Sequence, residues 1–160
     1  MINVKFAFAA ILILLAPVGL VSSQPRDGQG RAEQVAAQLP GRIPVSIGEK
    51  TVDAVLANTD PSRVQGLLGW DRITEQDGML LDFIAAGQYA IHMRGMKFPI
   101  DAIWIDGNGI IKLTYENLQP NSEQIYFSMF PCRYCLEVKA GFCRKFKVKA
   151  GQQVRLGAIR

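Results

Sequence analysis

The chain has 160 residues, is 49% hydrophobic and carries a formal net charge of +4. This length suits one domain with one core and argues against a multidomain protein. The positive charge is concentrated after Cys132, where eight Lys and Arg residues accompany only Glu137. No pattern of exposed aromatic residues is interleaved with these cations, so we expect a solvated basic face and no nucleic-acid partner.

Residues 1–23 are typical of a secretory signal peptide. Lys5 precedes an apolar run at residues 6–15, helix breakers follow it, and a cleavage site is expected after Ser23. The alternative is an uncleaved membrane anchor, although the run is shorter than the ~20 residues of a full span. No other segment could span a bilayer. We therefore expect a periplasmic or secreted protein without a membrane span after cleavage.

Residues 24–41 are polar and rich in Pro and Gly, which indicates a flexible leader. A single domain is expected over residues 42–160. It begins with apolar and polar residues that alternate on both sides of Gly48. This alternation predicts a β-hairpin over residues 45–56.

A short helix is predicted next. Thr59 or Asp60 can cap its N-terminus, Pro61 suits its first turn, and the apolar spacing continues to about Leu68. Gly66 would then lie in the middle of the helix. A helical glycine costs about 1 kcal/mol relative to alanine, so we expect another part of the backbone to pack closely there.

The rest of the chain contains short apolar segments separated by Gly, Pro and Asn. They predict strands at residues 79–84, 88–94, 98–106, 110–115, 124–129, 133–139 and 154–158, with a single helical turn at 141–146. Many short strands and little helix predict a mainly β fold. We expect a compact β-sandwich or barrel, mostly antiparallel, with one or two short helices.

The central motifs resemble the "domain of unknown function 192" family over about residues 43–156. The residues that carry the resemblance are Arg63, Gly66-Leu67, Gly78-Met79-Leu80, Met93-Arg94-Gly95-Met96, Phe98-Pro99-Ile100-Asp101, Trp104-Ile105-Asp106, Gly109-Ile110-Ile111 and Tyr134-x-Leu136-Glu137-Val138-x-Ala140-Gly141. The resemblance implies a compact, β-rich and often exported domain. It supplies no chemistry, because the function of the family is not established. This chain departs from the family pattern at His92, where many members have Trp, and at Cys135.

Asp101 is the first candidate for a binding residue. It follows Pro99 at the start of an apolar strand, so its carboxylate should be partly desolvated and should need a partner. One interpretation is a structural ion pair or turn cap. The other is that Asp101 acts with Arg94 and Arg63 to grip a small polar ligand.

Glu137 is the second candidate. Alternation within residues 133–139 places Tyr134 and Glu137 on opposite faces of a strand. An exposed Glu paired with a nearby cation is the simpler interpretation. If the fold brought Glu137 close to Asp101, the two carboxylates could instead perform acid–base chemistry.

His92, Met93 and Met96 offer soft ligands of the kind that hold copper in exported proteins. Buried methionines that only pack in a core are the simpler interpretation, and a lone His is more often structural than a ligand. No metal residue or cofactor is therefore assigned.

Cys132, Cys135 and Cys143 give an odd number of thiols in a chain expected to mature where disulfides persist. If residues 132–135 form a strand, Cys132 and Cys135 point to opposite faces and cannot easily bridge. A disulfide of Cys143 with Cys132 or Cys135 is then the expected arrangement. Buried thiols, or redox or metal chemistry, are the alternatives.

The sequence contains no Gly-rich phosphate loop, no nucleophile elbow and no paired-His metal motif. No catalytic residue is therefore assigned. The leading hypothesis is an exported monomer that binds a small molecule or an envelope protein without turnover, through Arg63, His92, Arg94, Asp101 and Glu137. An envelope enzyme using Asp101, Arg94 and Glu137 is the alternative, and a copper or thiol-redox role is the third.

Overall fold

The computed structural model of the chain describes residues 5–6 and 41–158. The predicted signal peptide and leader fall almost entirely outside these residues and remain predictions. The described strands are β1 (Lys5–Phe6), β2 (Arg42–Ile47), β3 (Lys50–Ala57), β4 (Asp77–Gly87), β5 (Tyr89–His92), β6 (Ile100–Ile105), β7 (Ile111–Leu118), β8 (Ile125–Phe127), β9 (Cys132–Lys139) and β10 (Val154–Leu156). The described helices are α2 (Asp60–Gln65) and α3 (Phe142–Lys145). The mainly β prediction is confirmed.

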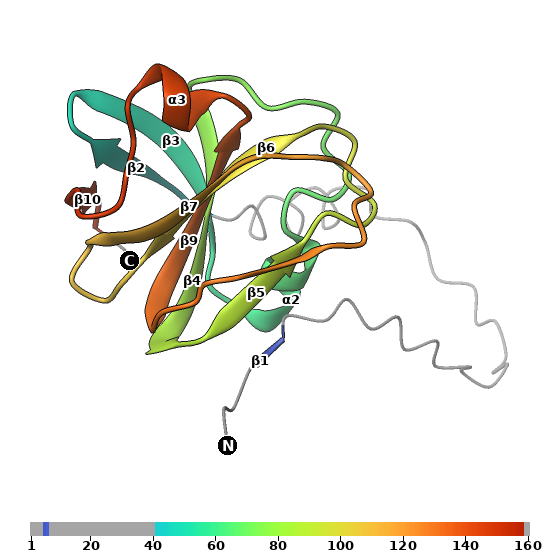
Figure 1. The fold of residues 1–160 in the computed structure, drawn as a ribbon, viewed down its shortest axis with the longest axis horizontal. Coiled ribbons are helices and arrows are strands. Elements are labelled where there is room, and N and C mark those ends of the chain that lie inside the picture. The colour runs from blue at the N-terminus through green and yellow to red at the C-terminus, as the bar shows by residue number, and fades with distance from the viewer. Residues whose placement is uncertain (1–4, 7–40, 159–160) are drawn as a thin grey trace, which may run out of the picture.

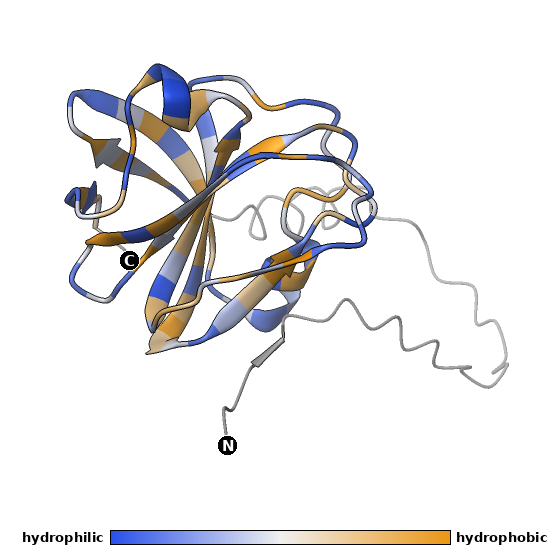
Figure 2. Ribbon diagram, viewed as in Figure 1, coloured by the Kyte–Doolittle hydropathy of each residue, from blue (hydrophilic) through white to orange (hydrophobic). Residues whose placement is uncertain are grey.

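The main sheet has seven strands in the order β10-β2-β3-β4-β9-β6-β7, and it curls into a half-barrel (Figure 1). A smaller sheet has the order β1-β5-β8. Apolar and polar residues alternate along the strands, as the two-residue period of a pleated strand requires (Figure 2). In the part of the chain that the structure describes, no helix is long and apolar enough to cross a membrane.

The strands of the main sheet pair antiparallel except at β3 and β4, which run parallel with Asp53 opposite Asp77. Parallel neighbours need a crossover connection, and here α2 lies in that crossover. The helix ends at Gln65, three residues earlier than predicted. Gly66 ends it with a φ of +48°, so the expectation that Gly66 lies inside the helix is wrong. A Cβ on Gly66 would have only the Arg63 carbonyl oxygen within 4 Å, so no close backbone crossing explains this glycine.

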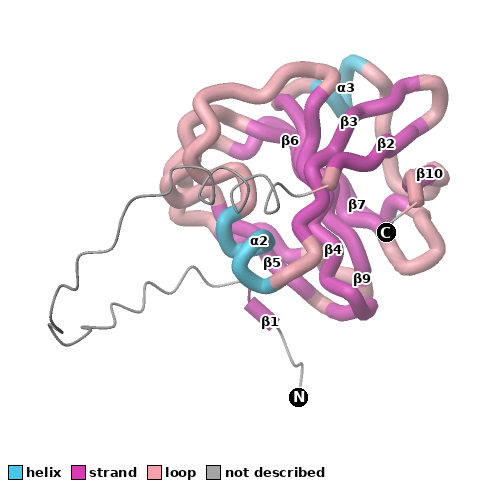
Figure 3. Tube along the Cα trace, turned by 180° about the vertical axis from the view of Figure 1, so that it is seen from behind, coloured by secondary structure: helices cyan, strands magenta, loops and turns pink. Residues whose placement is uncertain are grey.

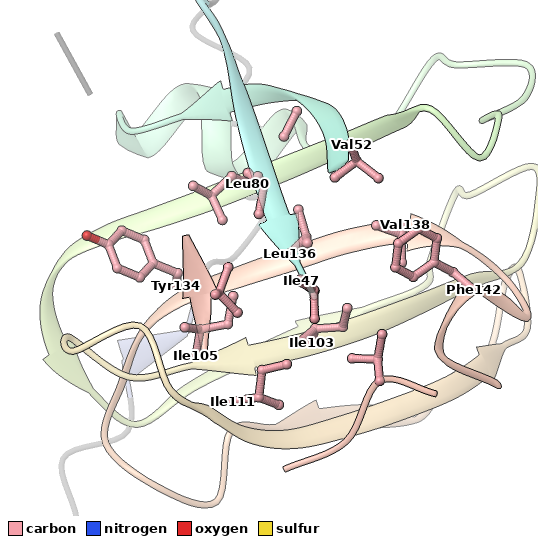
Figure 4. Close-up of a cluster of buried hydrophobic side chains, with 14 of the residues drawn as sticks. Ile47, Val52, Leu80, Ile103, Ile105, Ile111, Tyr134, Leu136, Val138 and Phe142 are labelled. Atoms are coloured by element: carbon pink, nitrogen blue, oxygen red, sulfur yellow. The ribbon is translucent and has the colours of Figure 1, made fainter. Parts of the chain in front are cut away.

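Two clusters of buried side chains pack on opposite faces of the curled sheet. The concave cluster fills the inside of the curl (Figure 4) and includes Ile47, Leu80, Ile103, Leu136 and Cys143. The convex cluster includes Leu67, Met93, Trp104, Cys132 and Cys135. The predicted alternation of β9 is confirmed, because Tyr134, Leu136 and Val138 belong to the concave cluster and Cys135 to the convex one.

The two edges of the main sheet meet at one end, in a contact that we call the β7–β10 junction. A β-bridge joins Ile110 to Gln153, and the Val154 N–H donates to the Gly109 carbonyl oxygen at 2.8 Å. Gly109 has a φ of +81°, and a Cβ there would lie 2.9 Å from the Val154 carbonyl oxygen. Glycine therefore permits this close approach. The junction brings the half-barrel close to closure.

Candidate functional site

A cavity lies between α2, the end of β5 and the convex face of the central strands. We call it the Glu137 cavity. Figures 1 and 3 both place α2 beside β5. Four of the five binding residues predicted from the sequence line it, namely Arg63, His92, Arg94 and Glu137. Apolar walls come from Leu67, Leu68, Leu81, Met93, Met96 and Ile100. The space open to the centres of water-sized molecules is about 50 Å³, enough for a few waters or the end of one small molecule.

Glu137 lies on β9, between β4 and β6, where the register places it opposite Met79 and Ala102. Only 7% of the residue is exposed. Its carboxylate makes no hydrogen bond or ion pair with any described residue. Its oxygens open into the cavity, since Trp104 Nε1 is the only fully buried side-chain nitrogen or oxygen without a partner in the described part of the chain. Burial raises the pKa of Glu137 to about 7. A buried carboxylate without a partner is unusual, because native proteins satisfy nearly all their buried polar groups.

Arg63 reaches the cavity from α2, with 11% of its side chain exposed. Its guanidinium forms an ion pair with Asp60 and donates to the Asp82 carbonyl oxygen at 2.6 Å. The Phe83 ring lies 5.9 Å from the guanidinium carbon. These contacts fix the side chain and balance its charge within the protein.

His92 and Arg94 approach from the end of β5. The Arg94 backbone N–H donates to Nδ1 of His92 at 3.3 Å, so the neutral ring carries its proton on Nε2. Burial, and then the Arg94 charge, lower the pKa of His92. The Arg94 side chain is exposed and makes no ion pair or hydrogen bond with any described residue. His92 and Arg94 therefore each present a hydrogen-bond donor.

The turn from Met93 to Met96 forms one wall and is held by Asn121. The Asn121 side-chain oxygen accepts from the Gly95 N–H at 3.0 Å, and the Asn121 N–H donates to the Met93 carbonyl oxygen at 2.8 Å. Gly95 has a φ of +76°, and a Cβ there would lie 3.0 Å from Leu68. Sequence reasoning did not assign Asn121 a role. Its place after a proline in a polar loop was the signal, since Asn tolerates the positive φ of 57° that it adopts.

Asp101, the fifth predicted binding residue, does not line the cavity. Its buried carboxylate accepts hydrogen bonds from the backbone N–H groups of Asn117 at 2.8 Å, Gly141 at 3.1 Å and Cys143 at 2.8 Å. It therefore fastens the start of α3 and a bend near the end of β7 to β6. The turn-cap interpretation describes this geometry, and the grouping of Asp101 with Arg63 and Arg94 does not.

The predicted disulfide is not formed in the structure. Cys132, Cys135 and Cys143 are all buried and unbonded. Cys143 lies in the concave cluster, whereas Cys132 and Cys135 lie in the convex one, so the sheet separates the expected partners. The expectation that Cys132 and Cys135 face opposite sides is also wrong. Both cysteines belong to the convex cluster, and Cys132 lies at the end of β9 where its register with β4 shifts between Asp82 and Gly87.

His92, Met93 and Met96 line the same cavity, with both methionines buried. None of the three cysteines lines this cavity. The thiols therefore do not lie with His92, Met93 and Met96 as the copper hypothesis requires. Within residues 5–6 and 41–158, no group of three or more His, Cys, Asp or Glu side chains could hold a metal ion.

A family model described as DUF192, Uncharacterized ACR, matches residues 43–156. The chain belongs to the DUF192 family. Every residue of the Glu137 cavity lies inside the range of the DUF192 match. No protein with a curated description matches the chain.

Two solved structures resemble this DUF192 domain. A Sinorhizobium meliloti protein, provisionally described as a transcription regulator, is 29% identical with a TM-score of 0.67, over 72% of this chain and 92% of that chain. A Novosphingobium aromaticivorans protein of unknown function is 20% identical with a TM-score of 0.65, over 71% of this chain and 83% of that chain. The second likeness concerns the fold alone.

Proposed function

We propose that this DUF192 domain is an exported, non-catalytic binding protein that holds a small polar molecule in the Glu137 cavity. The proposal is carried by the largely buried carboxylate of Glu137, which lines the cavity and makes no hydrogen bond or ion pair with any described residue. A buried carboxylate is costly unless another group completes its hydrogen bonds. A ligand that supplies a donor would remove that cost.

The composition of the cavity supports binding. Apolar walls with a few convergent polar groups are typical of small-molecule sites. Here the polar groups come from three separate elements, namely Arg63 on α2, His92 on β5 and Glu137 on β9. The small volume favours a small ligand, or one terminal group of a larger one.

A catalytic role needs an acid and a base that reach the same substrate. The candidate second carboxylate, Asp101, is occupied by three backbone donors and lies outside the cavity. This arrangement favours binding without turnover. Export is supported by the signal-like residues 1–23, with Lys5 ahead of an apolar run.

A fragment screen tests the proposal. Small polar fragments would be added to the full chain, and binding would be followed by thermal shift and by chemical shifts of the methionine methyl groups. Ligands should perturb Met93 and Met96, and Glu137→Gln should abolish their effect. Glu49→Gln, the same change in the exposed turn between β2 and β3, is the matched control and should bind normally. Hits that survive Glu137→Gln, or a screen without hits, would contradict the proposal.

A further inference from the structure

Resting on the proposed binding role, we infer that the Glu137 cavity takes a small amphoteric molecule, with its protonated amine against Glu137 and its carboxylate against Arg94 and His92. We call the buried end of the cavity, at Glu137, its floor, and the exposed end, at Arg94, its mouth. The floor carries a negative group and the mouth a positive one. Glu137 is buried on the central strand β9, whereas Arg94 is exposed at the end of β5.

The floor needs a hydrogen-bond donor that carries positive charge. Glu137 supplies only acceptors when ionised. Met93, Met96 and Ile100 are buried around the cavity and keep the surroundings of the carboxylate apolar. In such surroundings a charged donor binds a carboxylate more strongly than in water, and its aliphatic carbons can lie against the methionines.

Arg63 does not supply that charge. Its guanidinium pairs with Asp60 and bonds to the Asp82 carbonyl oxygen, and it makes no hydrogen bond or ion pair with Glu137. Neither Arg63 nor Arg94 forms an ion pair with Glu137, and burial raises the pKa of Glu137. The position beside Glu137 is therefore left for a cation from outside the chain.

The mouth has the opposite preference. Arg94 carries a positive charge with no acidic partner among the described residues, and His92 presents its Nε2–H because Nδ1 accepts from the Arg94 N–H. Two donors beside one positive charge suit a carboxylate. One molecule that carries both groups can satisfy floor and mouth together.

The affinity should depend on pH in a defined way. The titratable and charged groups that face the cavity are Arg63 from α2, His92 and Arg94 from the end of β5, and Glu137 itself; Cys135 lies beside Glu137 on β9. The residues opposite Glu137 on β4 and β6, Met79 and Ala102, do not titrate. Burial lowers the pKa of His92 and raises that of Cys135, so both shifts are away from the pKa of Glu137, which burial raises to about 7. Amine binding should rise about tenfold from pH 6 to pH 8 and then level off.

Calorimetric titration of the full chain with butylamine, butyrate and the ω-amino acids from glycine to 6-aminohexanoate tests the inference. One ω-amino acid should bind at least about tenfold more tightly than butylamine, because it adds a charged hydrogen bond at Arg94. Glu137→Gln should weaken its binding by more than about tenfold. Arg94→Gln should reduce its affinity to that of the plain amine, and Glu49→Gln should change nothing.

Three results would overturn the inference: butyrate binding as tightly as butylamine, amine binding that survives Glu137→Gln, or wild-type affinity that is flat between pH 6 and pH 8. The pH series needs only the wild-type chain, so it decides even if a variant does not fold. If amines do not bind while other fragments bind in a Glu137-dependent way, the result supports the proposed function and contradicts this inference. If no fragment binds, the result contradicts both the proposed function and this inference.

Discussion

The carboxylates of Asp101 and Glu137 lie on opposite faces of the curled sheet, although Asp101 is opposite Val138, the chain neighbour of Glu137. Asp101 points to the concave side, where it bonds to the Cys143 N–H, and Glu137 lines the cavity on the convex side. The two acids therefore have separate roles. Asp101 organises the backbone, and Glu137 faces the Glu137 cavity.

Removing the charge of Glu137 should stabilise the protein at neutral pH. The pKa of Glu137 is raised from 4.5 to about 7 in the folded state. Well below pH 4.5 the group is protonated in both states. As the pH rises toward 7, the unfolded chain releases its proton first, so the free energy of unfolding falls by about 3 kcal/mol by pH 8. In the Glu137→Gln protein, the free energy of unfolding should not show this decline between pH 4.5 and pH 8.

The measurement is urea denaturation of both proteins between pH 4.5 and pH 8, in the absence of ligand. The difference between the two free energies of unfolding isolates Glu137 from every other titrating group. Curves that remain parallel over this range would show that the carboxylate is solvated or has a partner in solution.

Asp101→Asn should destabilise the fold without changing ligand binding. The carboxylate accepts three backbone hydrogen bonds, and the amide that replaces it cannot accept all of them without bringing its own donors close to backbone N–H groups. We expect a loss of about 3 kcal/mol in the free energy of unfolding, since hydrogen bonds to a charged group are strong. Chemical denaturation measures the loss. Asp53→Asn on the exposed face of β3 is the matched control. A stable Asp101→Asn protein that no longer binds fragments would contradict this prediction and indicate that Asp101 takes part in ligand binding.

Breaking the ion pair between Asp82 and Arg133 should also destabilise the protein. Asp82 is 1% exposed, and both of its carboxylate oxygens accept from Arg133, at 3.0 and 3.1 Å. Arg133→Met leaves a buried charge without its cation, at a cost of about 2–3 kcal/mol. Adding Asp82→Asn should recover part of the loss in a double-mutant cycle. Purely additive effects would mean that the pair is not formed in solution.

The three cysteines should behave as unreactive thiols. All are buried, and burial raises the pKa of Cys132 to about 11, so little thiolate exists at neutral pH. A thiol reagent should label none in the folded chain and all three after denaturation without reductant, as measured by intact mass. One labelled cysteine in the denatured, unreduced chain would reveal a disulfide after all.

Local pattern was enough to find the strands and four of the residues that line the Glu137 cavity. Alternation in residues 133–139 separated Tyr134 from Glu137 correctly, and the turn after Asp106 gave the β6–β7 hairpin. Arg63, His92, Arg94 and Glu137 were chosen as charged or polar residues within apolar motifs, and the fold brings them to one cavity. Pattern works there because the two faces of a strand have a fixed period.

Pattern failed where the outcome depends on a distant segment. The donors that satisfy Asp101 come from Asn117, Gly141 and Cys143, and no local rule joins them to β6. Cys132, at the irregular end of the β4–β9 pairing, lies on the unexpected face. The parallel pairing of β3 with β4 likewise depends on the path of the crossover through α2, which brings the chain back to the sheet beside β3. These features are decided by tertiary pairing, which a single sequence does not display.

The β7–β10 junction has a consequence for the solubility of the protein. The edge of an open sheet offers unpaired backbone groups that can template association between molecules. Here β10 covers one edge of β2, and residues 151–154 bond to the beginning of β7, so a short C-terminal segment protects both margins. A chain cut before Gln152 would lose this protection at β2 and β7 together. We expect such a fragment to aggregate through its exposed edges even while the central strands stay paired.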